Sequence, residues 1–244
     1  IEDPIEYRIS GVTQIQVVPQ IGLTFARILR TLLRQDPDVM MVGEIRDQET
    51  AEITIRTALT GHLVFSTIHT NDACGAVTRL LDMGMDPFNF ADALLGILAQ
   101  RLAKRLCKEC KVAYQPSPDE IKKLLHEYSE ELLHTETWSK DPKAAMEGVY
   151  KEWTQRYAKD GKFTLYRAKG CPACNDTGYK GRVGLHELLV GTDPVKKLIQ
   201  EKARVAEILA EALNEGMRTL KMDGVEKVLQ GITDMAQVRA VCIK

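Results

Sequence analysis

The sequence predicts an α/β protein with a parallel sheet, followed by a cysteine-rich subdomain and a helical bundle. Three observations lead to this prediction. Short apolar runs alternate with helical segments up to residue 104, which is the order of elements in a parallel sheet. Two C-x-x-C pairs fall within residues 105–190, and apolar residues recur at helical spacing within residues 191–244. We therefore expect three parts with the boundaries 1–104, 105–190 and 191–244.

The first part has the element order β-α-β-α-β. Its apolar runs are short and lie between helices, which is typical of parallel strands that are buried on both faces. The expected segments are a strand that ends at residue 1, a β-rich connection at 12–18, a helix at 24–35 capped by Thr24, a strand at 39–42, a helix at 48–60 that stops at Gly61, a strand at 63–68, and a helix from about residue 71.

The residues at the strand ends carry the first functional signal. Ligands of parallel sheets bind at the carboxyl ends of the strands. The first strand ends in Glu2 and Asp3, the second in Glu44, and the third in His69 with two threonines. Together these endings predict an active site along one edge of the sheet.

Glu44 follows the apolar strand 39–42, where a phosphate-handling sheet holds a catalytic acid. A carboxylate there orients an attacking water or holds Mg²⁺ through its water shell. In the usual Walker B pattern an aspartate ends the strand, and here Gly43 stands in its place. The pattern alone leaves open whether Glu44 is catalytic or is simply the first charged residue after a core strand.

His62 and His69 flank the strand predicted at 63–68. In an extended strand they are about 23 Å apart, so they cannot both reach one phosphate by straight strand geometry. His69 is the better candidate because it lies at the carboxyl end. His62 fits a helix-cap or core role equally well.

Arg27, Arg30 and Arg34 recur along one side of the helix predicted at 24–35. Such a stripe is usually solvated or ion-paired. The alternative is that one of these arginines faces the nucleotide of a neighbouring subunit.

Four cysteines form the pattern of a tetrahedral zinc site. Cys107 and Cys110 make one C-x-x-C pair, and Cys171 and Cys174 make the other. Two such pairs supply the four thiolates that a structural Zn²⁺ requires, whereas four free thiols would leave their spacing unexplained. The pairs enclose an insert, residues 111–170, that is rich in lysine and glutamate and has helical stretches. We expect zinc to hold the insert to the sheet.

Composition excludes some classes of function. The formal net charge of −1 gives no reason to expect nucleic-acid binding. The longest apolar stretch, 93–99, is far shorter than the about 20 residues that span a bilayer. Paired cysteines that suit a metal favour a reducing, cytoplasmic location. The abrupt start without methionine suggests that these residues belong to a longer protein.

The ordered motifs resemble those of the secretion ATPases of type II secretion systems and of the related type IV pilus assembly ATPases. The resemblance covers nearly the whole chain. Its motifs are an acidic box, IEDPIEY, an atypical Walker B, LLRQDPDVMMVGEIRD, a histidine box, TGHLVFSTIHTND, a zinc subdomain made by the cysteine pairs and TGYKGRVGLHELL, and a terminal helical segment, GMRTLKMDGVEKVLQGITDMAQV.

The resemblance implies a partial RecA-like sheet and assigns roles to several residues. Glu2 and Glu44 would be the catalytic acids around Mg²⁺ and the attacking water. His69, alone or with His62, would sense the γ-phosphate of ATP. The residues expected to support the nucleotide or Mg²⁺ are Asp3, Glu6, Arg34 and Arg46.

Family members are hexameric rings that bind ATP between subunits. The resemblance therefore implies a homo-hexamer on the cytoplasmic side of the inner membrane. Its partners would be an inner-membrane platform protein and a cytoplasmic recruiter, with no nucleic acid. The four cysteines argue against the pilus-retraction branch, while secretion and pilus assembly share every motif quoted above.

Two features depart from the family pattern. No G-x-x-x-x-G-K-[ST] occurs in these residues, and that loop is what cradles the phosphates of ATP. Family order places it upstream, so we expect this chain alone to bind ATP poorly and not to hydrolyse it measurably. The insert is also longer than expected. The alternative function is a zinc-stabilised protein-interaction module without catalysis.

Overall fold

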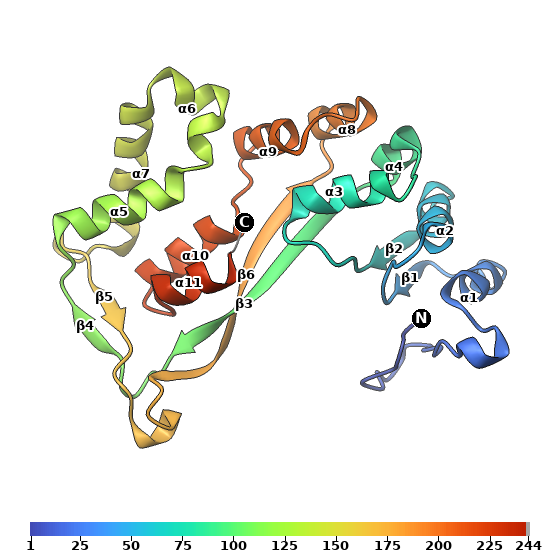
Figure 1. Ribbon diagram of the computed structural model, residues 1–244, viewed down its shortest axis with the longest axis horizontal. Coiled ribbons are helices and arrows are strands. Elements are labelled where there is room, and N and C mark those ends of the chain that lie inside the picture. The colour runs from blue at the N-terminus through green and yellow to red at the C-terminus, as the bar shows by residue number, and fades with distance from the viewer. Residues whose placement is uncertain (243–244) are drawn as a thin grey trace. The chain divides into compact units, whose positions relative to one another are not determined.

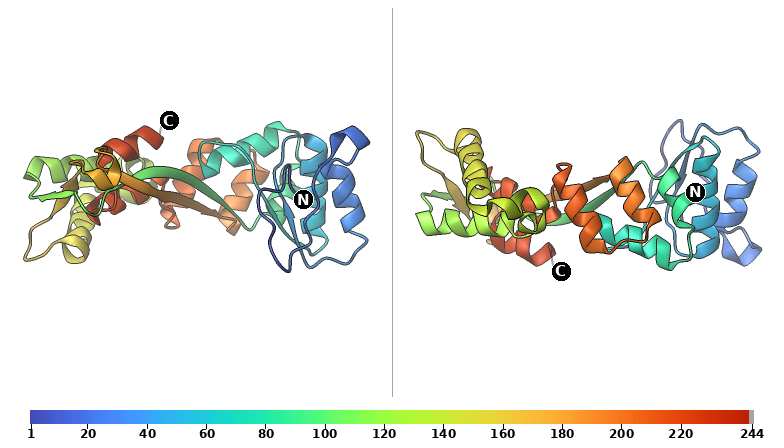
Figure 2. Two further views of the ribbon diagram at one scale, coloured as in Figure 1. Left: turned by 90° about the horizontal axis from the view of Figure 1, so that it is seen from below. Right: turned by 90° about the horizontal axis from the view of Figure 1, so that it is seen from above.

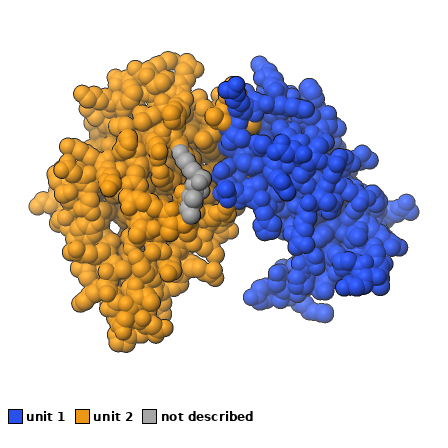
Figure 3. All heavy atoms as spheres, in the orientation of Figure 1, with its two compact units in different colours: residues 1–95, 191–205 blue, residues 96–190, 206–244 orange. Residues whose placement is uncertain are grey.

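The computed structural model describes residues 1–242, and these residues form two compact units (Figure 3). Unit 1 consists of residues 1–95 and 191–205. Unit 2 consists of residues 96–190 and the chain from residue 206 onward. This division differs from the three parts expected from the sequence, and that three-part division stays a prediction. No helix within residues 1–242 is long and apolar enough to cross a membrane.

From α1 to α3 the elements of unit 1 alternate between helix and strand, as expected, and two further helices follow (Figure 1). The elements are α1 (Phe25–Leu32), β1 (Val39–Val42), α2 (Gln48–Leu59), β2 (Leu63–Ser66), α3 (Ala73–Asp82), α4 (Pro87–Ala93) and, after the chain returns from unit 2, α8 (Asp193–Gln200), with a 3₁₀ turn at Pro19–Ile21. The hydroxyl of Thr24 accepts from the N–H of Arg27, which confirms the expected cap of α1.

Strands β1 and β2 pair in parallel, from Val39 opposite Leu63 to Val42 opposite Ser66. The expectation that both faces of these strands are buried is wrong for the described residues. The burial of β1 alternates along the strand, and the side chain of Phe65 in β2 is 54% exposed. Side chains alternate between the faces of a strand, and the core of α1 and its neighbours includes Met40 and Val42 from one face only.

Unit 2 is built on a long strand pair and several helices. Its elements are β3 (Gly96–Leu106), β4 (Val112–Tyr114), α5 (Pro118–Ser129), α6 (Glu136–Lys140), α7 (Pro142–Tyr157), β5 (Leu165–Arg167), β6 (Tyr179–Val190), α9 (Val205–Asn214), α10 (Leu220–Leu229) and α11 (Met235–Val241), with 3₁₀ turns at Leu132–His134 and Pro172–Cys174.

Strands β3 and β6 are antiparallel and run side by side in every view (Figure 2). Helices α10 and α11 pack on each other and on these strands. A Cβ at Gly224 of α10 would lie 2.5 Å from a methyl carbon of Val238, so glycine permits this close packing. Helices α10 and α11 therefore pack on the β3–β6 sheet of unit 2, while α8 packs on α4 in unit 1.

The insert is fastened to α10 by aromatic and charged side chains. Trp153 of α7 is buried and stacks edge-on against Tyr128 of α5, with 5.2 Å between ring centroids. The hydroxyls of Tyr128 and Tyr157 donate to Glu226 of α10 at 3.4 and 3.0 Å. The buried aromatic pair and the two tyrosine hydroxyls that bond to one carboxylate give the insert a defined position in unit 2.

An ion pair between α5 and α11 supplies a pH-dependent part of this attachment. Arg239 donates two hydrogen bonds to Glu127, at 3.0 and 2.6 Å. These bonds lower the pKa of Glu127 below its ordinary value of 4.5. The ion pair therefore stabilises the fold above that value, and its contribution is lost as the pH falls through the lowered pKa of the folded state.

We expect the coupling between Glu127 and Arg239 to be about 1 kcal/mol at neutral pH, since the guanidinium is half-exposed and the geometry is bidentate. Urea unfolding of Glu127→Gln, Arg239→Gln and the double variant measures this coupling. The coupling should vanish at a pH below the folded-state pKa of Glu127. A coupling that is equal at neutral and acidic pH would contradict this assignment.

Candidate active site and candidate metal centre

The segment that carries Glu2 lies against the end of β1. The amino group of Ile1 donates to the carbonyl of Met41, and the N–H of Gly43 donates back to the carbonyl of Ile1, both at 2.8 Å. This exchange of hydrogen bonds is that of parallel strands. Glu2 and Glu44 therefore leave the sheet at the same edge, as the sequence predicts.

Gly43 permits this contact because it has no side chain. A Cβ on residue 43 would lie 2.8 Å from the carbonyl oxygen of Ile1 and 3.4 Å from the Cα of Glu2. The first distance is shorter than real Cβ contacts, so an aspartate in the usual Walker B position would push the segment away. The unusual glycine is thus explained by the backbone that passes beside it.

The carboxylate of Glu44 lies beside a guanidinium and an imidazole. It accepts a hydrogen bond from Nε of Arg46 at 2.5 Å and lies 3.8 Å from Nε2 of His69. Arg46 also reaches Asp3, at 3.7 Å. The side chain of Glu44 is 12% exposed and that of His69 is 92% exposed. The structure therefore brings Asp3, Glu44, Arg46 and His69 into one cluster, with the imidazole facing solvent.

The hydrogen bond to Glu44 raises the pKa of Arg46 above its ordinary value, with a further contribution from the charges of Glu44 and Asp3. The guanidinium is therefore charged at any pH where the protein is folded. A fixed positive charge at this position orients the Glu44 carboxylate.

Two hydrogen bonds at this edge of the sheet were not predicted from the sequence. Nε2 of Gln14 donates to the carboxylate of Glu2 at 2.6 Å, and the hydroxyl of Thr67 donates to the carbonyl of Gly43 at 2.5 Å. The sequence signal that could have indicated Gln14 is the alternation of apolar and polar residues within 12–18. Val17 there is buried, which leaves the glutamine on the other side of the segment.

Other predicted residues lie outside the cluster. His62 is at the amino end of β2, and its Nδ1 lies 3.1 Å from the carbonyl of Thr57 in the last turn of α2, which is the helix-cap arrangement. Arg34 is exposed and follows the end of α1, so it does not continue a helical stripe. Arg30 pairs with Glu49 at 2.6 Å. Arg27 of α1 and Glu6 are exposed, and Glu6 lies in a loop.

The four predicted metal ligands meet in unit 2, where all four sulfur atoms lie within 4.8 Å of one another. The sulfur of Cys171 is 4.0 Å from that of Cys107 and 3.7 Å from that of Cys174, and the sulfurs of Cys110 and Cys174 are 3.8 Å apart. Sulfurs at the corners of a tetrahedron about 2.3 Å from a central ion are about 3.8 Å apart. The donor set and its spacing therefore fit Zn²⁺.

The backbone around Cys174 favours a thiolate. Burial disfavours the charged form, but the N–H groups of Cys171 and Gly178 donate to the sulfur at 3.3 and 3.2 Å. Together these interactions bring the pKa of Cys174 down to about 7. Hydrogen bonds of this kind support metal-bound sulfur, since a ligating cysteine must lose its proton.

We expect Gly43→Ala to loosen the segment before it, because the new methyl group meets the carbonyl of Ile1. The N–H of Val17, which donates to the carbonyl of Glu2 at 2.9 Å, should exchange with solvent faster. Amide hydrogen exchange measures this effect. Gly148→Ala is the control, because a Cβ there meets nothing within 4 Å. Unchanged exchange at Val17 in Gly43→Ala would contradict the steric explanation.

Comparison with known proteins agrees with the resemblance. The type IV pilus assembly ATPase PilB of Thermus thermophilus is 47% identical over an alignment that covers 100% of this chain, insert included, and 24% of that protein. The type II secretion system ATPase E of Vibrio cholerae is 44% identical, over 99% of this chain and 42% of that protein. The chain thus spans less than half the length of these relatives.

Solved structures share the fold. The pilus retraction motor PilT with bound ADP superposes with a TM-score of 0.61 at 23% identity, over 98% of this chain and 50% of that chain. The ATPase DotB of Yersinia pseudotuberculosis also gives 0.61, at 18% identity and over 47% of its own length. The family model described as type II/IV secretion system protein matches residues 1–240. This chain therefore belongs to the type II/IV secretion system protein family.

Proposed function

We propose that these residues are part of an ATP-hydrolysing motor subunit that powers type II protein secretion or type IV pilus assembly. The observation that carries the proposal is the cluster at the carboxyl edge of the parallel strands, where Glu44 is held by Arg46 beside His69. Ligands of parallel sheets bind at this edge. Two relatives, 47% and 44% identical, are named as ATPases of these two machines.

In this proposal each group of the cluster has a separate role. Glu44 orients the water that attacks the γ-phosphate, and Arg46 fixes the direction of its carboxylate. Glu2, held by Gln14, acts with Glu44 around hydrated Mg²⁺. His69 is exposed at this edge and contacts the γ-phosphate, which enters from solvent.

In this proposal the loop that cradles the phosphates of ATP lies elsewhere in the protein, since no G-x-x-x-x-G-K-[ST] occurs among these residues. We infer that the whole protein works as a homo-hexamer at the cytoplasmic face of the inner membrane. It would couple ATP hydrolysis to movement of an inner-membrane platform protein. A cytoplasmic recruiter protein would bind it at the membrane. In unit 2, Zn²⁺ bound by the four cysteines would have a structural role.

Glu44→Gln should lower kcat for ATP hydrolysis by a factor of about 10² or more, because the neutral amide loses the negative charge with which the carboxylate orients the attacking water. The measurement is steady-state phosphate release by the protein that carries these residues together with its phosphate-binding loop. Glu52→Gln is the matched control, since Glu52 is exposed on α2 and its carboxylate accepts a hydrogen bond from Gln48 of the same helix. Equal activity of the two variants would exclude the role proposed for Glu44.

Purified protein should contain one zinc ion per chain, and Cys110→Ser should lower both the zinc content and the melting temperature of unit 2. Elemental analysis and thermal unfolding measure these quantities. Cys242→Ser is the control, because Cys242 is not part of the sulfur cluster. If Cys110→Ser keeps its full zinc content, the four cysteines are not the metal site.

A further inference from the structure

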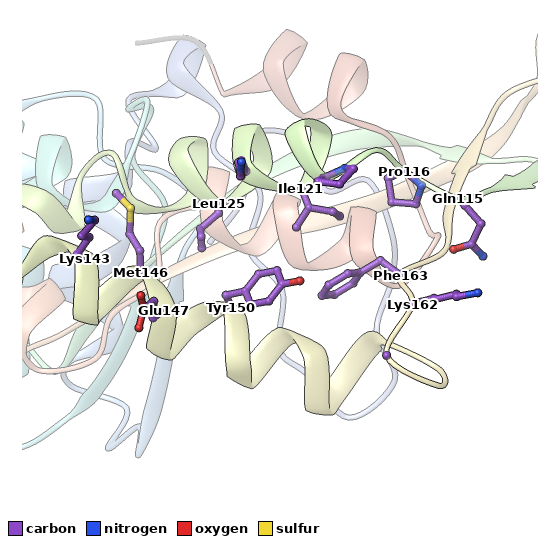
Figure 4. Close-up of a pocket in the computed structure, with 13 residues that line it drawn as sticks. Gln115, Pro116, Ile121, Leu125, Lys143, Met146, Glu147, Tyr150, Lys162 and Phe163 are labelled. Carbon is purple, nitrogen blue, oxygen red and sulfur yellow. The ribbon is translucent and has the colours of Figure 1, made fainter.

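The insert contains an apolar groove of about 490 Å³ between α5 and α7 (Figure 4). This volume lies within the range of protein ligand sites, about 300–1,000 Å³. The groove belongs to unit 2 and shares no residue with the carboxylate cluster or the four cysteines. Neither the proposed hydrolysis of ATP nor the binding of zinc accounts for it.

Each helix lines the groove with residues at helical spacing. From α5 come Pro118, Ile121 and Leu125, which are at positions i, i+3 and i+7. Leu125 points into the groove, toward α7 (Figure 4). Residues with this spacing lie along one side of a helix, over a length of about 10 Å. The neighbouring side of α5 is occupied, since Leu124 is buried and α5 packs on α10.

Helix α7 repeats the same spacing. Lys143, Met146 and Tyr150 line the groove at positions i, i+3 and i+7, and the ring of Tyr150 remains 44% exposed. At one end the ring of Phe163 lies 5.9 Å from that of Tyr150. The buried Trp153, one turn further on, holds α7 against α5, so the groove is formed in the absence of a ligand.

The two rows of groove-lining residues, one on α5 and one on α7, form a surface on which a third helix can pack. A helix that places apolar residues at i, i+3 or i+4 and i+7 presents an anchor row about 10 Å long, which equals the length of each groove-lining row. Met146 supports such a contact because its unbranched thioether adapts to the shape of a partner side chain.

The charges around the groove indicate the chemistry of this partner. Lys122, Lys143 and Lys162 line it, against a single acid, Glu147. Lys122 lies 3.7 Å from Asp119, and both side chains are solvent-exposed. In the close-up view Lys143 lies at one end of the groove and Lys162 at the other (Figure 4). A fatty acid has one charged end, whereas an acidic helix can carry a carboxylate at each end of its apolar row.

We propose that the groove between α5 and α7 is a docking site for an acidic amphipathic helix of a protein partner. Apolar residues of that helix fill the space between Leu125, Met146 and Tyr150. Its acidic residues pair with the lysines at the two ends of the groove. The insert is then a recognition element within unit 2, fastened to α10 by the hydrogen bonds of Tyr128 and Tyr157 to Glu226.

The test uses this chain and a fluorescein-labelled synthetic helix of about 16 residues, with leucine at i, i+4 and i+7 and glutamate on both flanks. A twin peptide carries lysine in place of every glutamate. Fluorescence anisotropy measures binding, and NMR shifts locate it. We expect the acidic peptide to shift resonances of α5 and α7 and to bind about tenfold more tightly than its twin.

The double variant Lys143→Glu and Lys162→Glu should weaken binding of the acidic peptide about tenfold and improve binding of the twin. Lys151→Glu, on α7 but outside the groove, is the control and should bind as the unchanged chain does. The proposal is overturned if neither peptide binds, if both bind equally, or if the double variant behaves like the control. Dodecanoate that shifts the same resonances while the peptides do not would assign the groove to an anionic amphiphile and would also overturn it.

Discussion

The arrangement of acidic side chains depends on the backbone contact between Ile1 and the end of β1. Two hydrogen bonds, to Met41 and from Gly43, fix the first residues beside the strand that carries Glu44. The contact requires that residue 43 have no Cβ. Because this one approach sets where Glu2 leaves the sheet, two carboxylates far apart in sequence share an edge. The hydroxyl of Thr67 bonds to the same glycine, so the end of β2 is tied to the same point.

The same edge also gives Glu44 and His69 different environments. The carboxylate of Glu44 is largely covered and held by Arg46, while the imidazole of His69 lies in solvent within reach of it. A covered, oriented acid and an exposed histidine suit a site where a phosphate approaches from outside the sheet.

In unit 2, Cys107 directly follows β3, and Cys174 precedes β6 by a few residues. A metal ion bound there would hold together the ends of β3 and β6 where the insert begins and ends. The rest of the insert is held to α10 by contacts of Tyr128 with Trp153 and Glu226.

Several elements were predictable because their signal is local. The strands predicted at 39–42 and 63–68, the cap Thr24 and the cysteine spacing depend on neighbouring residues. The structure has strands at 39–42 and 63–66, the cap and the group of four cysteines. The pairing of β3 with β6 was not predicted, because the partner strand lies beyond the insert. Gln14 was missed for a similar reason, since its role depends on where the segment 12–18 folds back onto Glu2. Straight strand geometry placed His62 and His69 at opposite ends of β2, and the structure agrees. Strand geometry alone could not show that the imidazole of His69 lies near the carboxylate of Glu44.

The most direct test of the proposed site is a crystal structure of the protein that carries these residues and its phosphate-binding loop, with Mg²⁺ and a non-hydrolysable ATP analogue. We predict that the γ-phosphate lies at the carboxyl edge of β1 and β2. His69 should then be within hydrogen-bond distance of it, and Glu44 and Glu2 should face the hydrated Mg²⁺. A nucleotide bound away from this edge, with Glu44 still paired only with Arg46, would contradict the account.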